Sequence, residues 1–219
     1  MNILKKLKLP FVIDKTLSEK FSQVFAFAEI KLINPDGSIA HKHKQVIHSL
    51  NANFLMAFYA GFNEYTTAAN YGFTAPFTTN HSVIDLTNVN VQPASTNILS
   101  SKGDTNNSNT GIVVGTGVPT VAPLTYNLTS KITSGVGAGQ LSYVQQSSAL
   151  GVTVLGTDSS LVVTRTFINN SGAPITVKEF GIQACVASPY LYLVDPISPA
   201  TTVNALQTLS IAVTFKITT

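Results

Sequence analysis

The 219-residue chain has one cysteine, one arginine, no tryptophan and little charge of either sign. Charged residues make up 11% of it and apolar residues 44%, whereas about 25% of the residues in a typical soluble domain are charged. The lone cysteine, Cys185, excludes an internal disulfide, and its apolar neighbours indicate a core position. The sequence has no apolar run long enough for a transmembrane helix, so no membrane contact is expected. Asn, Thr and Ser replace the missing charge, which favours association with other protein surfaces.

The positive charge is concentrated at the N-terminal end. Residues 1–50 hold eight lysines and four acidic residues, whereas residues 51–219 hold five basic and six acidic residues. The longer part lacks a basic stripe with interleaved aromatic residues, so nucleic acid is not an expected partner.

Residues 1–22 are basic, are interrupted by Pro10 and have no strong periodicity. We therefore expect an extended arm that docks on a neighbouring subunit, with Lys5, Lys6 and Lys8 as its interaction residues. Charged residues break the apolar centre that a signal peptide needs, so no secretion is expected.

From residue 23 onward, short apolar segments alternate with Gly, Pro and Asn, as in antiparallel sandwiches and barrels. The turn Asn34-Pro35-Asp36-Gly37 predicts a hairpin. In the last segment, residues 206–218, apolar and polar residues alternate with a period of two. The expected strands are 24–33, 38–47, 111–115, 124–132, 140–146, 150–155, 160–168, 174–186, 190–194 and 206–218. The prediction is a mainly β fold, a jelly-roll-like antiparallel β-sandwich in one domain over residues 23–219.

One stretch departs from the β pattern. Leu50, Phe54, Phe58 and Phe62 recur every four residues, which predicts an amphipathic helix at about 49–61 that covers an open sheet. A long loop insertion, residues 63–110, is expected to follow it and to make contacts. Its most polar part, residues 100–111, reads as an exposed mobile tip.

The segment GIVVGTG, residues 111–117, resembles a phosphate-binding loop at first sight. Such a loop needs a following helix, and Pro119 and Pro123 make a helix there unfavourable. The lysine of the Gly-Lys-Ser/Thr loop is also absent. We therefore expect a strand that ends in a glycine turn, with Gly115 and Gly117 as structural residues and no cofactor.

His41, His43 and His48 form the only cluster of potential metal ligands. On a strand, the first two project from the same face. Lys42 and Lys44 interleave with them and no carboxylate follows nearby, so a solvated strand is the preferred interpretation. A metal site completed across a symmetry axis is the sharper alternative.

Other chemistry is sparse. There is no Gly-x-Ser-x-Gly motif, no histidine after residue 81, and no acidic pair that suggests a hydrolase, so we expect no enzyme and no small-molecule substrate. Arg165 and Glu179 flank a predicted hairpin whose turn begins at Asn169 and includes Gly172, which suggests a structural cross-strand ion pair. An edge strand with Tyr190 and Tyr192 is a candidate contact or glycan-binding surface.

The β-rich half resembles a group of uncharacterised structural proteins of tailed bacteriophages. The shared pattern is a Gly-Thr-Gly turn, a Tyr-x-Leu segment, an Arg-x-Phe-x-Asn strand and an Ile-Thr-Val-x-Glu-x-Gly strand. These occur here at residues 115–117, 126–128, 165–169 and 175–181. The resemblance covers about residues 45–219, although Val194-Asp195 stands where the group often has Arg-Asp.

The resemblance implies a non-enzymatic virion structural protein of the tail, neck or capsid surface, assembled in the host cytoplasm. Its expected partners are copies of itself, in a ring or a lattice, and other virion proteins. The alternative is a receptor- or glycan-binding fibre or decoration module.

Overall fold

The structure is a computed structural model that describes residues 23–50, 54, 101–122, 125–148, 152–185 and 189–218. These residues form two antiparallel sheets. The strands of the larger sheet are β1 (Gln23–Ile33), β2 (Ile39–Val46), β4 (Ser142–Tyr143), β5 (Ser147–Ser148), β6 (Thr153–Leu155), β7 (Asp158–Ile168) and β10 (Thr208–Thr218). Those of the smaller sheet are β3 (Gly111–Gly115), β8 (Ile175–Cys185) and β9 (Pro189–Val203). The mainly β prediction is confirmed.

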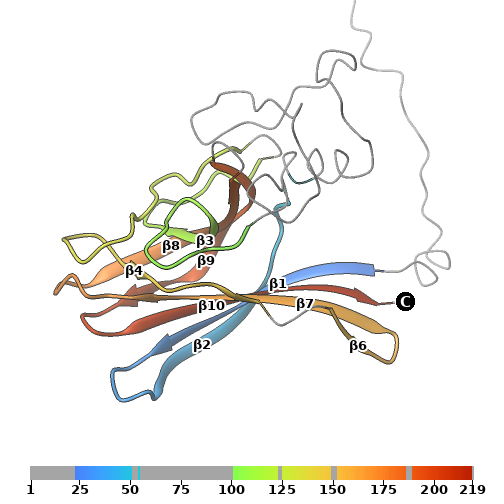
Figure 1. Ribbon diagram of the computed structural model, residues 1–219, viewed down its shortest axis with the longest axis horizontal. Helices are drawn as coiled ribbons and strands as arrows, with labels where there is room; N and C mark the ends of the chain where they lie inside the picture. Colours follow the sequence, from blue (N-terminus) through green and yellow to red (C-terminus); the bar gives the residue numbers. More distant parts are fainter. Residues whose placement is uncertain are drawn as a thin grey trace, which may run out of the picture.

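The larger sheet has the order β2-β1-β10-β7-β4, with β5 and β6 also paired to β7, and the smaller sheet has the order β3-β8-β9. The two sheets lie in separate layers (Figure 1) and contribute to one hydrophobic core. The jelly-roll connectivity stays a prediction, because the link from β2 to β3 includes residues 51–53 and 55–100, outside the described residues.

The apolar side chains of β10, which recur with a period of two, face the core as predicted. Leu209, Ile211 and Val213 are fully buried, and in register with them on β1 lie Leu32, Ile30 and Ala28, which are also buried. Along β10 the burial then decreases: Phe215 is half-buried and Ile217 is exposed. The core therefore ends before the larger sheet does.

The predicted hairpin around Asn169 is wrong, although the turn itself is present and Gly172 has a φ of 77° there. The flanking strands belong to different sheets, because β7 pairs with β10 whereas β8 pairs with β3 and β9. The buried Asn169 amide donates to the carbonyls of Ala173 and Val203, each at 2.7 Å. These bonds attach the turn to the end of β9, at the place where the chain passes from the larger sheet to the smaller one.

The predicted helix at about 49–61 is not borne out at its start. Residues 48–50 are not helical, and Leu50 forms an antiparallel bridge with Leu193 of β9. The rest of that stretch, Phe54 excepted, lies outside the described residues. Phe54 itself is helical, but the named elements of the described residues are all strands. The predicted hairpin of β1 and β2 is confirmed, with Gly37 at a φ of 85°.

The predicted strand at 124–132 is wrong in its described part, residues 125–132. This segment meets β3 only through a bridge between Gly115 and Lys131. The N–H groups of Thr129 and Ser130 bind a carboxylate instead of a neighbouring strand.

Candidate interaction surfaces

Arg165 is fully buried on β7 and uses all five of its N–H donors. It donates at 2.6 to 3.0 Å to the backbone carbonyls of Val144, Thr110, Ile112, Asp104 and Asn107. The Tyr143 ring centroid lies 4.8 Å from its Cζ atom. Burial lowers the pKa of Arg165 to about 10, so the guanidinium is charged at neutral pH.

This arginine determines the path of residues 101–110. A Cβ on Gly103 would lie 2.6 Å from the Arg165 Cζ atom, so the loop backbone packs directly on the guanidinium. Half of residues 101–110 in the expected exposed tip are exposed, as predicted, but Arg165 binds the loop backbone to the larger sheet. The predicted ion pair of Arg165 with Glu179 is wrong, because both side chains bind backbone groups.

Glu179 is the counterpart of Arg165 in the smaller sheet. Its carboxylate is buried and accepts the N–H groups of Thr129 at 3.0 Å and Ser130 at 2.7 Å. A Cβ on Gly117 would lie 2.9 Å from Oε1, and one on Gly115 would also collide with this side chain. Gly115 and Gly117 thus make room for a carboxylate of the chain itself, which supports the structural role predicted for them.

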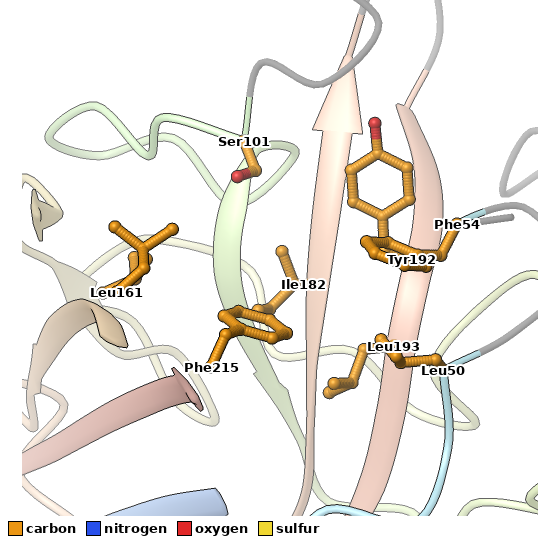
Figure 2. Close-up of a pocket in the computed structure, with 9 residues that line it drawn as sticks. Leu50, Phe54, Ser101, Leu161, Ile182, Tyr192, Leu193 and Phe215 are labelled. Atoms are coloured by element: carbon orange, nitrogen blue, oxygen red, sulfur yellow. The ribbon is translucent and has the colours of Figure 1, made fainter. Parts of the chain in front are cut away.

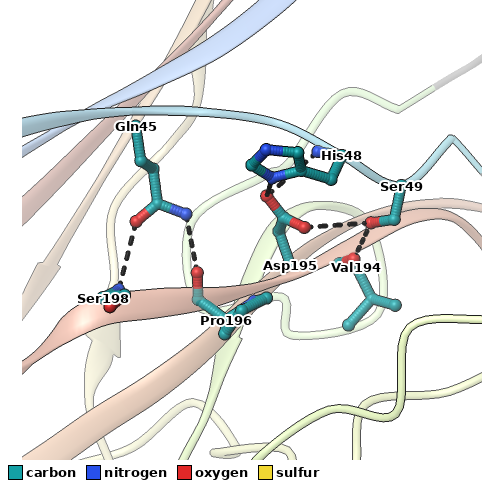
Figure 3. A network of polar contacts seen from close by, with 7 residues as sticks. All are labelled: Gln45, His48, Ser49, Val194, Asp195, Pro196 and Ser198. Carbon is teal, nitrogen blue, oxygen red and sulfur yellow. Dashed lines mark hydrogen bonds and ion pairs between the residues drawn. The ribbon is translucent and has the colours of Figure 1, made fainter.

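A polar network joins the end of β2 and the residues after it to β9 (Figure 3). Gln45 donates to the Pro196 carbonyl at 2.6 Å and accepts the Ser198 N–H at 3.2 Å. Asp195, which is 1% exposed, accepts the backbone N–H of His48 and the hydroxyl of Ser49, each at 3.3 Å. Burial raises the pKa of the Asp195 carboxyl.

Ser49, His48 and Asp195 lie close together and have the residue types of a catalytic triad. In such a triad the histidine ring takes the proton of the serine. Here the Ser49 hydroxyl is buried and contacts Asp195 and the Val194 carbonyl, not the His48 ring. That ring is exposed, with Nδ1 3.9 Å from Asp195. The arrangement anchors a chain segment and does not activate a nucleophile.

A small apolar cavity of about 120 Å³ lies between the sheets (Figure 2). Its lining comes from both sheets and from the chain after β2: Leu161, Val163, Phe215, Ile182, Tyr192, Leu193, Leu50, Phe54 and Ser101. Ligand pockets usually measure about 300–1,000 Å³. The cavity is therefore a packing gap near the end of the core.

Tyr190 and Tyr192 lie beside this gap and are buried, which corrects the prediction that they form a contact surface. Their hydroxyl oxygens are 3.1 Å apart and their rings meet edge to face. The Phe54 ring also meets Tyr192 edge to face. Both tyrosines serve as packing residues on β9.

β6, the start of β7 and the end of β10 project past the smaller sheet (Figure 1). Apolar side chains are exposed at this end of the larger sheet. We call this group the apolar tip; it consists of Val152, Val154, Leu155 and Ile217, which are 62%, 68%, 80% and 44% exposed. Val154 and Ile217 both pair with Ser159, one from each side, so they lie in one row of the sheet. Leu155 follows Val154 on β6 and therefore faces the other side of the sheet, so the tip exposes apolar side chains on both faces of this sheet end and is a candidate interface.

The outer face of the larger sheet carries positive charge. Glu29 contacts Lys31 at 2.7 Å, Lys42 at 3.1 Å and Lys44 at 3.6 Å. The hydrogen bond from Lys31 is the main reason why the pKa of Glu29 falls to about 2. One carboxylate faces three ammonium groups, so this face suits an acidic partner.

The three candidate metal ligands separate into a pair and a single residue. His41 and His43 lie side by side on β2, whereas His48 is beside Asp195. Within the described ranges, no group of three or more His, Cys, Asp and Glu side chains is placed to hold a metal. The predicted arm residues Lys5, Lys6 and Lys8 lie outside the described residues.

Comparison with protein-family models, curated proteins and solved structures finds no match to this chain. In the part of the chain that the structure describes, no helix is long and apolar enough to cross a membrane.

Proposed function

We propose that this chain is a non-enzymatic structural protein of a tailed-phage virion, which assembles with copies of itself and with neighbouring proteins in the tail, neck or capsid surface. The observation that carries the proposal is the apolar tip. A soluble monomer rarely leaves a compact apolar surface open, and such surfaces commonly mark protein interfaces. The assignment to a phage virion rests on the resemblance in residues 45–219, and a jelly-roll-like sandwich is the fold we propose with it.

The use of the charged side chains supports an assembly role over catalysis. Arg165, Glu179 and Asp195 are the buried charged groups of the described residues, and each binds the backbone of another segment. They hold loops against the two sheets and so build rigid surfaces. A receptor- or glycan-binding role would use the loops of residues 63–110 together with Tyr190 and Tyr192. The two tyrosines are buried and residues 63–100 lie outside the described residues, so we do not propose it.

Light scattering on the full chain over a range of concentrations tests the proposal. We expect an oligomer of defined mass, visible as a ring or lattice fragment in negative stain. The double substitution Val154→Lys and Ile217→Lys should weaken association at least tenfold, because it places two charges in the interface. Val136→Lys is the matched control, since Val136 is 66% exposed but lies in a separate turn. A wild-type monomer at every concentration, or equal loss in the control, would contradict the proposal.

Deletion of residues 1–22 tests the arm separately. β1 begins at Gln23 and keeps its whole pairing with β10 in the truncated chain. We expect a folded protein with an unchanged melting temperature that no longer assembles. Retained assembly would show that the arm is not required.

A further inference from the structure

His41 and His43 alternate with lysines on β2, which is the edge strand of the larger sheet. The Nε2 atom of His41 and the Nδ1 atom of His43 are 3.2 Å apart. Their ring centroids are 5.2 Å apart and the rings are tilted by 45°. This contact is a hydrogen bond in which one ring donates an N–H and the other accepts it, so the two nitrogens face each other.

The separation of these nitrogens matches the spacing of two ligands on one metal ion. Imidazole nitrogens bind Zn²⁺ at about 2.0–2.1 Å. Two such bonds place their nitrogens roughly 2.9 Å apart at a right angle and roughly 3.3 Å apart at the tetrahedral angle. The observed 3.2 Å lies between these values, so one cation can replace the hydrogen between the two nitrogens once the donor ring carries its proton on its other nitrogen and both rings turn toward a common point.

The interleaved lysines do not oppose a cation at this position. Lys42 and Lys44 are directed to the opposite face of the strand, where they bind Glu29 at 3.1 and 3.6 Å. On the histidine face, the partners in register on β1 are Leu32 and Ile30, which carry no charge.

The histidine atoms themselves are suited to ligation. The Nε2 atom of His43 is buried, so the ligand on this ring is Nδ1, the atom in contact with His41.

We propose that His41 Nε2 and His43 Nδ1 chelate one divalent transition cation of the imidazole-binding class, such as Zn²⁺, Ni²⁺ or Cu²⁺. Two side chains supply two ligands, and water completes the coordination shell of the isolated chain. Because β2 is an edge strand, another copy could approach the site from that side and supply further ligands. The site does not depend on the proposed virion function.

Isothermal titration of the full chain with Zn²⁺ at pH 7.5 tests this site. We expect one cation per chain, with binding weakened at least tenfold in both His41→Ala and His43→Ala. His48→Ala is the matched control and should bind as the wild type does, because its ring lies beside Asp195. Mg²⁺, which prefers oxygen ligands, should give no binding heat.

The same variants also exclude an indirect effect. His41 is exposed and His43 half-buried, so both alanine variants should keep the wild-type melting temperature without metal. No Zn²⁺ binding by the wild type up to about 1 mM, or an equal loss of binding in His48→Ala, would overturn the proposal.

Discussion

The two ends of β7 lie in opposite environments. Near its C-terminal end, Arg165 is fully buried and bound to five backbone carbonyls. Near its N-terminal end, Ser159 lies between Val154 and Ile217, whose apolar side chains are exposed. At one end of this strand, the polar groups around Arg165 form hydrogen bonds within the chain. At the other end, the side chains of the apolar tip are exposed to solvent. The difference separates the part of the molecule that maintains the fold from the part available to a partner.

Two buried charged side chains, one in each sheet, hold neighbouring loops in place. Arg165 holds residues 101–110, and Glu179 holds the N–H groups of Thr129 and Ser130. A buried group with complete hydrogen bonding stabilises its partners, whereas the loss of one member leaves several groups unsatisfied. Substitution of Arg165 or Glu179 should therefore lower the stability of the fold, whereas substitutions in the apolar tip should weaken association.

The largest expected effect is that of Arg165→Met, which keeps the apolar stem and removes every donor. The carbonyls of residues 110 and 112 are then left without their partner inside the protein. We expect a loss of about 3–5 kcal/mol in the free energy of unfolding, measured by urea denaturation. Arg165→Lys, which keeps the charge and three donors, should lose less. A loss below about 1 kcal/mol in Arg165→Met would contradict the proposed role of the arginine.

Glu179→Gln should have the next largest effect. The amide keeps one acceptor oxygen but presents a donor NH₂ group to one of the two N–H groups at Thr129 and Ser130. We expect a loss of about 1–3 kcal/mol in the free energy of unfolding. Amide hydrogen exchange should show faster exchange at these two positions. Lys178→Gln, at an exposed neighbour, is the control and should leave exchange unchanged.

Asp195→Asn should have a smaller effect, visible as a change in pH dependence. Burial raises the pKa of Asp195 above its ordinary value of 3.8. Between the unfolded and the folded pKa, the folded chain binds more protons, so the contribution of Asp195 to stability falls as the pH rises through this window.

Asp195→Asn has no carboxyl that titrates at this position. As the pH rises from about 4 to 7, the free energy of unfolding of the wild type should therefore fall relative to that of Asp195→Asn. Urea denaturation at several pH values measures this difference. Glu29 and Asp158, whose pKa values are lowered, are present in both proteins and cancel. A pH-independent difference would show that Asp195 does not titrate as inferred.

Local patterns predicted most of the strands, because their causes are local, but they also predicted a strand at 124–132 that the described part of this segment does not form. The period of two fixed the buried face of β10, and Pro35 with Gly37 fixed the first hairpin. The sequence did not reveal the partners of Glu179 and Asp195, because their bonds join residues between 49 and 147 positions apart. Backbone N–H and carbonyl partners also leave no signature in a sequence. For the same reason Asn169 was recognisable as a turn residue, but the change of sheet was not.

A matched pair of Val→Thr substitutions tests whether the apolar tip is open to solvent while the core of the same sheet is closed to it. Val213 and Val154 both lie on strands of the larger sheet, but Val213 is fully buried whereas Val154 is 68% exposed. Threonine has nearly the same shape as valine, so the pair measures the cost of placing a hydroxyl at each site. We expect a loss of about 1–3 kcal/mol in Val213→Thr and less than about 0.5 kcal/mol in Val154→Thr, by urea denaturation at a concentration where the chain is monomeric. Equal losses would mean that the apolar tip is covered within the chain itself, and the surface on which the assembly proposal rests would not exist.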